Sequence, residues 1–169
     1  MSAILTLGLL QPTALSKSLT NGEFILEEAT VDSIHEAFAK NQISCTELVQ
    51  KYLDRIEAYD RQGPTLNSII TVNPNALEIA AELDREYKYN RGNVGSLHCI
   101  PVILKDNFNT FDMPTTGGNV AMKDSIPSED AFTVKKMREA GAIILAKSNL
   151  QEFARGGVSV SSLGGQVLN

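Results

Sequence analysis

The stretch Ile100-Pro101-Val102-Ile103-Leu104-Lys105-Asp106-Asn107 decides how this chain folds. Its apolar run is typical of a strand buried in a sheet, and a turn-rich loop containing Pro114-Thr115-Thr116-Gly117-Gly118 follows it. The strand ends in a lysine. A lysine delivered from a buried strand is costly unless its ammonium is paired, reaches water or is kept neutral for chemistry.

Strand geometry limits the choices for this lysine. Side chains alternate across a strand, so we expect Lys105 and Asp106 to point to opposite faces of the sheet and not to pair. Without a carboxylate beside it, a half-buried amine is not held charged, and it could act as a base near neutral pH. The other interpretation is that Lys105 leaves the sheet at its edge and is solvated. The strand pattern alone leaves both open.

The remaining periodicity predicts an α/β fold, in which helices cover a sheet. Ser44 and Glu47 fit a capping box at the start of one helix. We also expect Ser128 to cap a helix, and Asn149 to cap a short helical turn that reaches Arg155. The expected helices cover residues 31–40, 44–63, 76–87 and 128–141, and the expected strands cover residues 66–72, 100–105 and 142–146.

Composition excludes some classes of protein. The 169 residues are 43% hydrophobic and 21% charged with a net charge of -5, so no basic patch favours nucleic acid and we expect none as a partner. No apolar run is long enough to span a membrane. Residues 1–22 are expected to be an N-terminal tail or the remnant of a secretory signal. The apolar run at 3–10 favours a signal, whereas the absence of Lys or Arg before it argues against one. Localisation therefore stays open, with the cytoplasm favoured over secretion or the periplasm.

Cysteines and histidines do not form a recognisable site. Cys45 and Cys99 are too few for a disulfide scaffold and lack metal-ligand spacing, so we expect two buried free thiols. No pattern joins His35 or His98 to a thiol or carboxylate cluster. We therefore expect no metal site and no histidine-based catalysis.

Several consecutive blocks resemble the N-terminal part of the amidase signature family. They are Ile100-Pro101-Val102 leading into Lys105-Asp106-Asn107, the segment Pro114 to Gly118, and Ala140 to Asn149 followed by Glu152-Phe153. The resemblance covers most of residues 44–169. It implies a mixed β-sheet core covered by α-helices, with residues 23–169 forming the first part of a single amidase domain that is incomplete in this chain.

The resemblance also implies a Ser-cisSer-Lys triad that hydrolyses a carbon-nitrogen bond without a metal or organic cofactor. Lys105 occupies the position of the family's catalytic base. Both catalytic serines of the family would lie beyond Asn169, so we expect the chain alone to be inactive. Ser159, Ser161 and Ser162 resemble the segment that leads up to the serine block, and we interpret them as ordinary loop serines.

We expect the remaining notable residues in and around these blocks to have mainly structural roles. Cys99 stands where the family often has glycine. We expect Gly117 and Gly118 to form a turn with positive backbone angles, with a substrate-side role as the less favoured alternative. Asp130 and Glu152 are expected to cap helices or to pair with other groups.

Three functions remain open at this point. The first is an amidase acting on a small-molecule or peptide amide. The second is the amidase subunit of an aminoacyl-tRNA amidotransferase, and the third is a non-catalytic binding fragment. The sequence does not identify the substrate or the oligomeric state.

Overall fold

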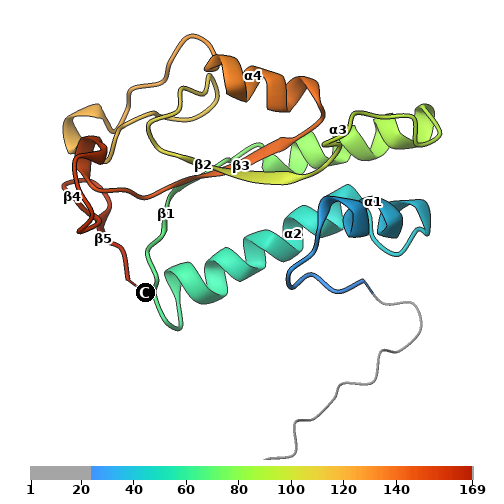
Figure 1. The fold of residues 1–169 in the computed structure, drawn as a ribbon, viewed down its shortest axis with the longest axis horizontal. Coiled ribbons are helices and arrows are strands. Elements are labelled where there is room, and N and C mark those ends of the chain that lie inside the picture. Colours follow the sequence, from blue (N-terminus) through green and yellow to red (C-terminus); the bar gives the residue numbers. More distant parts are fainter. Residues whose placement is uncertain (1–23, 169) are drawn as a thin grey trace, which may run out of the picture.

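A computed structural model describes residues 24–168 of the chain (Figure 1). The expected tail or signal remnant, residues 1–22, lies outside the described residues, and so does Asn169. The boundary between this tail and the domain therefore stays a prediction.

The described part contains four α-helices and five strands (Figure 1). The helices are α1 (Val31–Ala39), α2 (Cys45–Arg55), α3 (Ala76–Tyr89) and α4 (Phe132–Glu139), and the strands are β1 (Ile69–Val72), β2 (Pro101–Lys105), β3 (Ile143–Ser148), β4 (Val160–Ser161) and β5 (Gly165–Gln166). All the elements expected from periodicity are present, most with bounds that differ by a few residues. None of the helices between residues 24 and 168 has the length and apolar character that a bilayer span needs.

The main sheet is mixed, as the resemblance implied. Its strand order is β1-β3-β2, with β3 parallel to β2 and antiparallel to β1. The pairing of β2 with β3 shifts by one residue, because Val102 pairs with Ile144 but Ile103 pairs with Ala146. Leu145 is therefore an extra residue in β3, a β-bulge that changes which side chains face which side of the sheet.

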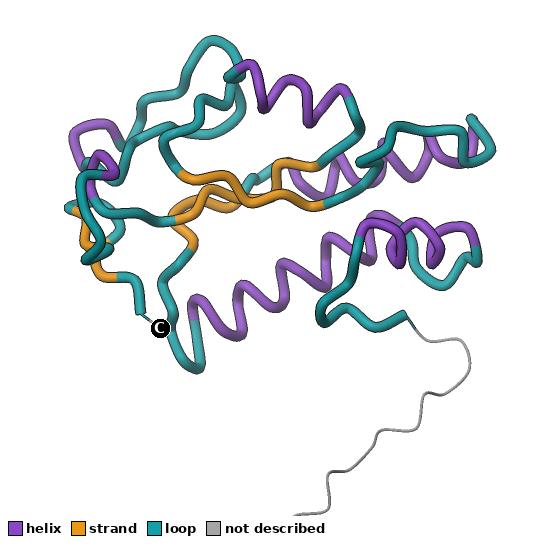
Figure 2. The backbone as a smooth tube through the Cα atoms, viewed as in Figure 1, coloured by secondary structure: helices purple, strands orange, loops and turns teal. Residues whose placement is uncertain are grey.

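Helices cover both faces of this sheet (Figures 1 and 2). In both views α4 lies on one side of β2 and β3, and α1 and α2 lie on the other. Alternate residues of β3 join two separate apolar clusters: Ile143 and Leu145 pack with α1, α2 and α3, whereas Ile144 packs with Leu104 and α4. The unbroken apolar run of β3 follows from burial on both faces.

The first turn of α2 is held by several polar contacts. The capping box forms as expected, with 3.2 Å from Glu47 N to Ser44 Oγ and 2.8 Å from Ser44 N to Glu47 Oε2. The carboxylate of Asp84, on α3, accepts hydrogen bonds from the backbone N–H groups of Cys45 and Thr46. These contacts satisfy donors that a helix leaves unpaired at its start.

The expected cap of α4 is wrong. This helix begins at Phe132, and its N-cap position is Ala131, whose side chain makes no capping hydrogen bond. Ser128 lies in the exposed loop before it. The backbone N–H of Ala131 donates instead to the carbonyl of Asn109, so the loop after β2 fixes the start of the helix.

The expectation of two free thiols is also wrong. Cys45 and Cys99 form a disulfide across a sequence separation of 54 residues, with their Cα atoms 5.7 Å apart. The count and spacing of the cysteines gave no sign of this bond. It depends on the tertiary contact between the first turn of α2 and the segment that enters β2.

Removing the cap of α2 tests this account of the helix start. We expect Ser44→Ala to lower the free energy of unfolding by about 1 kcal/mol, because the N–H of Glu47 loses its acceptor. Ser128→Ala is the matched control, with an expected change within about 0.5 kcal/mol. Urea denaturation of both variants measures the difference, and equal losses would contradict the assignment of the caps.

Candidate active site

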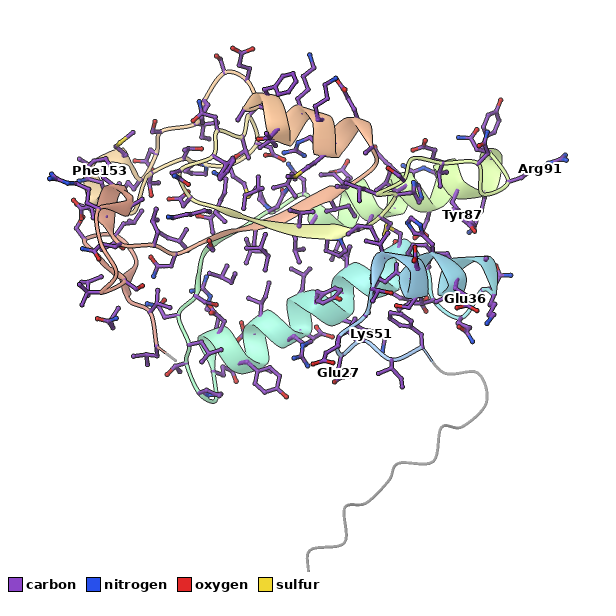
Figure 3. All side chains as sticks on the ribbon, in the orientation of Figure 1. Glu27, Glu36, Lys51, Tyr87, Arg91 and Phe153 are labelled. Atoms are coloured by element: carbon purple, nitrogen blue, oxygen red, sulfur yellow. A yellow bond between two sulfur atoms is a disulfide. The ribbon has the colours of Figure 1, made fainter. Side chains whose placement is uncertain are left out.

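The candidate site lies at one edge of the main sheet. Because β2 and β3 are parallel, they end together, and Lys105 pairs with Ser148 in their register. The loop of residues 106–118 and the segment of residues 149–166 follow these two strand ends. Figure 3 labels Phe153 at this end of the molecule and Arg91 at the opposite end. The carboxyl ends of parallel strands are where α/β proteins commonly bind ligands.

Lys105 and Asp106 point away from each other, as strand alternation predicted. Lys105 is exposed, on the same face of the sheet as Ile103, which is itself 49% exposed. Asp106 is fully buried on the other side. Among the described residues, the ammonium of Lys105 reaches solvent at the end of its strand.

The buried lysine of this region is Lys147, which lies near the end of β3. Its side chain is completely buried, and its Nζ donates to the carbonyl oxygens of Phe108 (2.7 Å) and Pro114 (3.2 Å) and to Thr115 Oγ1 (2.9 Å). It lies 3.5 Å from Asp106 Oδ1. Burial lowers the pKa of Lys147, and the carboxylate of Asp106 opposes this effect.

The contacts of Lys147 are those of a charged ammonium rather than of a base. An ammonium has three N–H donors and no acceptor, and three acceptors surround this Nζ in addition to a carboxylate. A neutral amine has only two N–H donors, so it could not make all three of these hydrogen bonds. The ammonium of Lys147 therefore connects the first and second halves of loop 106–118.

Sequence reasoning missed Lys147 because of the bulge in β3. Lys147 pairs with Leu104, and partners in register share a face of the sheet, so the extra residue Leu145 places the lysine on the α4 side beside Asp106. The only available signal was a lysine that directly follows an apolar run. The same signal singled out Lys105, and only the three-dimensional register distinguishes the two.

The second half of the loop folds around Asp106. Its Oδ2 accepts hydrogen bonds from both the backbone N–H and the hydroxyl of Thr116, and its carbonyl accepts from Gly117 N at 2.9 Å. Gly118 N donates in turn to Thr116 Oγ1 at 2.9 Å. Gly117 and Gly118 have φ values of 59° and 77°, and a Cβ at Gly118 would lie 2.8 Å from Cβ of Ser161. The expected turn is present, and both glycine N–H groups are used inside it.

Arg138 of α4 holds the outer part of the loop. Its guanidinium lies 2.8 Å from Asp112 Oδ1 and 3.0 Å from Asp130 Oδ2, and it stacks 4.9 Å above the ring of Phe111. Asp130 also accepts a hydrogen bond from the backbone N–H of Phe111, and Asp112 from the amide of Asn73. Asp130 thus pairs structurally, as expected.

Asn149 joins three segments at the site edge and does not cap a helix, contrary to expectation. Its Oδ1 accepts from Leu150 N, and its Nδ2 donates to the carbonyls of Asn67 (3.0 Å) and Gly164 (2.9 Å). The short helical turn that follows spans Glu152–Ala154 and has no side-chain cap. Because Asn149 is buried between the residues that precede β1 and the last described segment, its amide is used for tertiary contacts.

Glu152 fastens the loops around this edge. It accepts hydrogen bonds from Ser162 N at 2.8 Å and from the side-chain amide of Asn119 at 2.6 Å. The hydrogen bonds from Ser162 are the main reason that the pKa of Glu152 lies below its ordinary value. Glu152 pairs structurally, which is one of the two roles expected for it.

The three serines of the last segment make the contacts of loop residues. Ser161 Oγ donates to Asn149 Oδ1 and accepts from Gly164 N, and Ser162 Oγ accepts from Val120 N. Ser159 has a positive φ and accepts a backbone hydrogen bond through its carbonyl. Within residues 24–168, no lysine or histidine is hydrogen-bonded to these hydroxyls, so the structure shows no activated nucleophile here.

Comparison with known proteins identifies the family. The family model for amidases matches residues 47–169, so the chain belongs to the amidase family. An amidase-named relative from Schizosaccharomyces pombe is 43% identical over 130 residues, which cover 76% of this chain and 22% of the relative. A glutamyl-tRNA(Gln) amidotransferase subunit from Alkaliphilus metalliredigens is 40% identical over 139 residues, covering 81% of this chain and 27% of that protein.

A solved structure supports the same assignment. The native peptide amidase from Stenotrophomonas maltophilia superposes with a TM-score of 0.78 at 40% sequence identity, over 85% of this chain and 30% of that one. The resemblance noted from the sequence, including the α/β class with a partial mixed sheet, is confirmed. The chain spans about a quarter of the length of the curated relatives it matches.

Replacing each lysine separates their structural contributions. We expect Lys147→Met to lower the free energy of unfolding by about 3 kcal/mol or more, because Asp106 is left as a buried charge without its partner. Lys105→Met removes an exposed side chain, so its expected effect is within about 0.5 kcal/mol. Chemical denaturation provides the measurement.

A double variant tests whether the loss of stability comes from the broken ion pair between Lys147 and Asp106. In Lys147→Met/Asp106→Leu no charge is left unpaired, so we expect a smaller loss than the sum of the two single variants. Strict additivity of the two losses would show that the ion pair does not carry the effect.

Proposed function

We propose that the protein hydrolyses the carbon-nitrogen bond of an amide and that Lys105 is its catalytic base. The observation that supports this most directly is that Lys105 and Asp106, although adjacent in the Lys-Asp-Asn block, differ in burial and in their contacts. Asp106 is buried and used by Lys147 and Thr116, whereas Lys105 is exposed at the edge where the parallel strands end. The carboxylate of Asp106 contacts Lys147 and Thr116 on the other face of the sheet, so it does not pair with Lys105.

In the proposed mechanism, Lys105 takes a proton through a bridging serine, and a second serine attacks the amide carbonyl. A serine hydroxyl is a weak nucleophile until a base accepts its proton. Backbone N–H donors stabilise the oxyanion that forms, and water then hydrolyses the acyl-enzyme. We expect both serines to come from chain beyond Asn169, as in the family pattern. Gly117 and Gly118 do not supply the oxyanion donors here, because their N–H groups are already bonded within the loop.

We propose a peptide amide or a small linear amide as the substrate. The similarity to the peptide amidase of Stenotrophomonas maltophilia supports this choice. Release of ammonia from a panel of C-terminally amidated dipeptides and simple aliphatic amides would identify the preferred class. Ammonia release from none of these amides would contradict the proposal.

Replacing Lys105 tests its role in the full-length protein. We expect Lys105→Ala to reduce kcat by roughly 100-fold or more, because the base is lost. Lys123→Ala is the matched control, since Lys123 is exposed in the loop after the two glycines, and it should leave kcat unchanged. An active Lys105→Ala enzyme with an unaltered pH profile would exclude the lysine as the base.

The isolated chain of residues 1–169 should not hydrolyse amides. The hydroxyls of Ser161 and Ser162 are engaged in structural hydrogen bonds, and none of the described lysines activates them. A serine-directed fluorophosphonate probe should therefore leave Ser159, Ser161 and Ser162 unlabelled, as read by mass spectrometry. Strong labelling at any of the three would overturn this expectation.

A second candidate is the amidase subunit of an aminoacyl-tRNA amidotransferase. The 40% identity to the amidotransferase subunit from Alkaliphilus metalliredigens favours it. Such a subunit would release ammonia from glutamine and pass it to aminoacyl-tRNA only when its partner subunits are present. Hydrolysis of peptide amides by the protein alone would favour the first candidate.

A further inference from the structure

We propose that the Cys45–Cys99 disulfide is a permanent structural cross-link, formed while the protein folds in an oxidising compartment. This inference does not depend on the proposed amidase activity. It rests on the position of the bond, on the backbone conformation of Cys99 and on the burial of both cysteines.

The bond connects α2, which lies outside the candidate site, to the segment before β2, the strand that ends in Lys105. Cys45 is the first residue of α2, where the capping box and Asp84 already hold the backbone. Cys99 lies two residues before β2, and its N–H donates to the carbonyl of Gly141 in the turn between α4 and β3. One covalent bond therefore joins the start of α2 to the entry of the strand that ends in Lys105. The Cα separation of 5.7 Å lies in the most common range for disulfides.

The backbone conformation of Cys99 is unusual for a residue with a side chain. Its φ is 59°, in the left-handed region where glycine is the least strained residue. Hydrogen bonds from its neighbours, between Leu97 and Ala140 and between Ile100 and Ile143, hold this conformation in place. A side chain at such a position destabilises the fold unless a stabilising interaction compensates for the backbone strain. At Cys99 the cross-link to Cys45 is that compensating interaction.

Burial indicates that the bond is structural and not a redox switch. Cys45 is 2% exposed and Cys99 is 0% exposed. Exchange with a small thiol requires that the thiolate reach a sulfur atom, and the folded structure blocks this approach. The bond must therefore form before the fold closes, and it persists afterwards.

Formation of the bond needs an oxidant. The two thiols lose two protons and two electrons as the sulfur–sulfur bond forms, and a protein or glutathione disulfide accepts them and becomes a pair of thiols. Cytosolic thiols are normally kept reduced, whereas secretory and extracellular compartments maintain such oxidants. The cross-link thus favours a secreted or periplasmic location over the cytoplasm.

The first experiment determines the state of the bond in the natural protein. The full-length protein is taken from its own cells, alkylated at lysis, digested without reductant and analysed by mass spectrometry. We expect a peptide pair joined through Cys45 and Cys99 that is two hydrogen atoms lighter than the reduced pair. We also expect dithiothreitol to cleave the bond only after denaturant is added. Two alkylated cysteines would overturn the proposal, and rapid reduction in the native state would overturn the structural role.

The second experiment measures what the bond does for stability. In oxidised protein we expect Cys45→Ala and Cys99→Ala each to lower the thermal midpoint by several degrees, and the double variant to lower it little further because both remove one bond. Cys99→Gly is the matched control, because it also removes the bond but relieves the positive φ, so it should melt above Cys99→Ala. Additive losses, or a Cys99→Gly protein as stable as the oxidised wild type, would contradict the proposal.

Discussion

The contact on which the rest of the site depends is the buried ammonium of Lys147. Loop 106–118 is buried at Asp106, Thr110 and Met113 and again over residues 115–118, so its buried carbonyl groups need donors that water does not supply there. One Nζ serves the carbonyls of Phe108 and Pro114 and the hydroxyl of Thr115, and it neutralises Asp106. Removing this side chain would leave the carbonyl of Pro114 without a donor and Asp106 without its ion pair, whereas the carbonyl of Phe108 also accepts from the hydroxyl of Thr115. Lys147 thus holds the loop that begins directly after Lys105.

Much of the fold could be predicted because it depends on patterns among residues that are close together in the sequence. The capping box of Ser44 and Glu47 and the apolar faces of the helices depend on residues three or four positions apart. The alternation that separates Lys105 from Asp106 depends on adjacent residues. Such short-range patterns survive folding unchanged when the tertiary structure agrees with them.

The features that were missed all depend on contacts between distant segments. Asn149 donates hydrogen bonds to Asn67, just before β1, and to Gly164 in the last segment, and it does not cap the helical turn that follows it. The disulfide joins residues 54 positions apart. The bulge at Leu145 shows no sign in an apolar run that is buried on both faces. At the candidate site, the family blocks predicted Lys105 as the catalytic base, which stays a prediction, and no sequence pattern pointed to Lys147.

The single extra residue in β3 has a consequence for how this chain tolerates change. Lys105 ends β2 and Lys147 lies one residue before the end of β3. The number of residues before each lysine determines which one faces solvent and which one faces the interior. A substitution elsewhere in β3 preserves that count, whereas an insertion or deletion of one residue would reverse it and turn the buried charge outward. For this strand, length is a stricter constraint than composition.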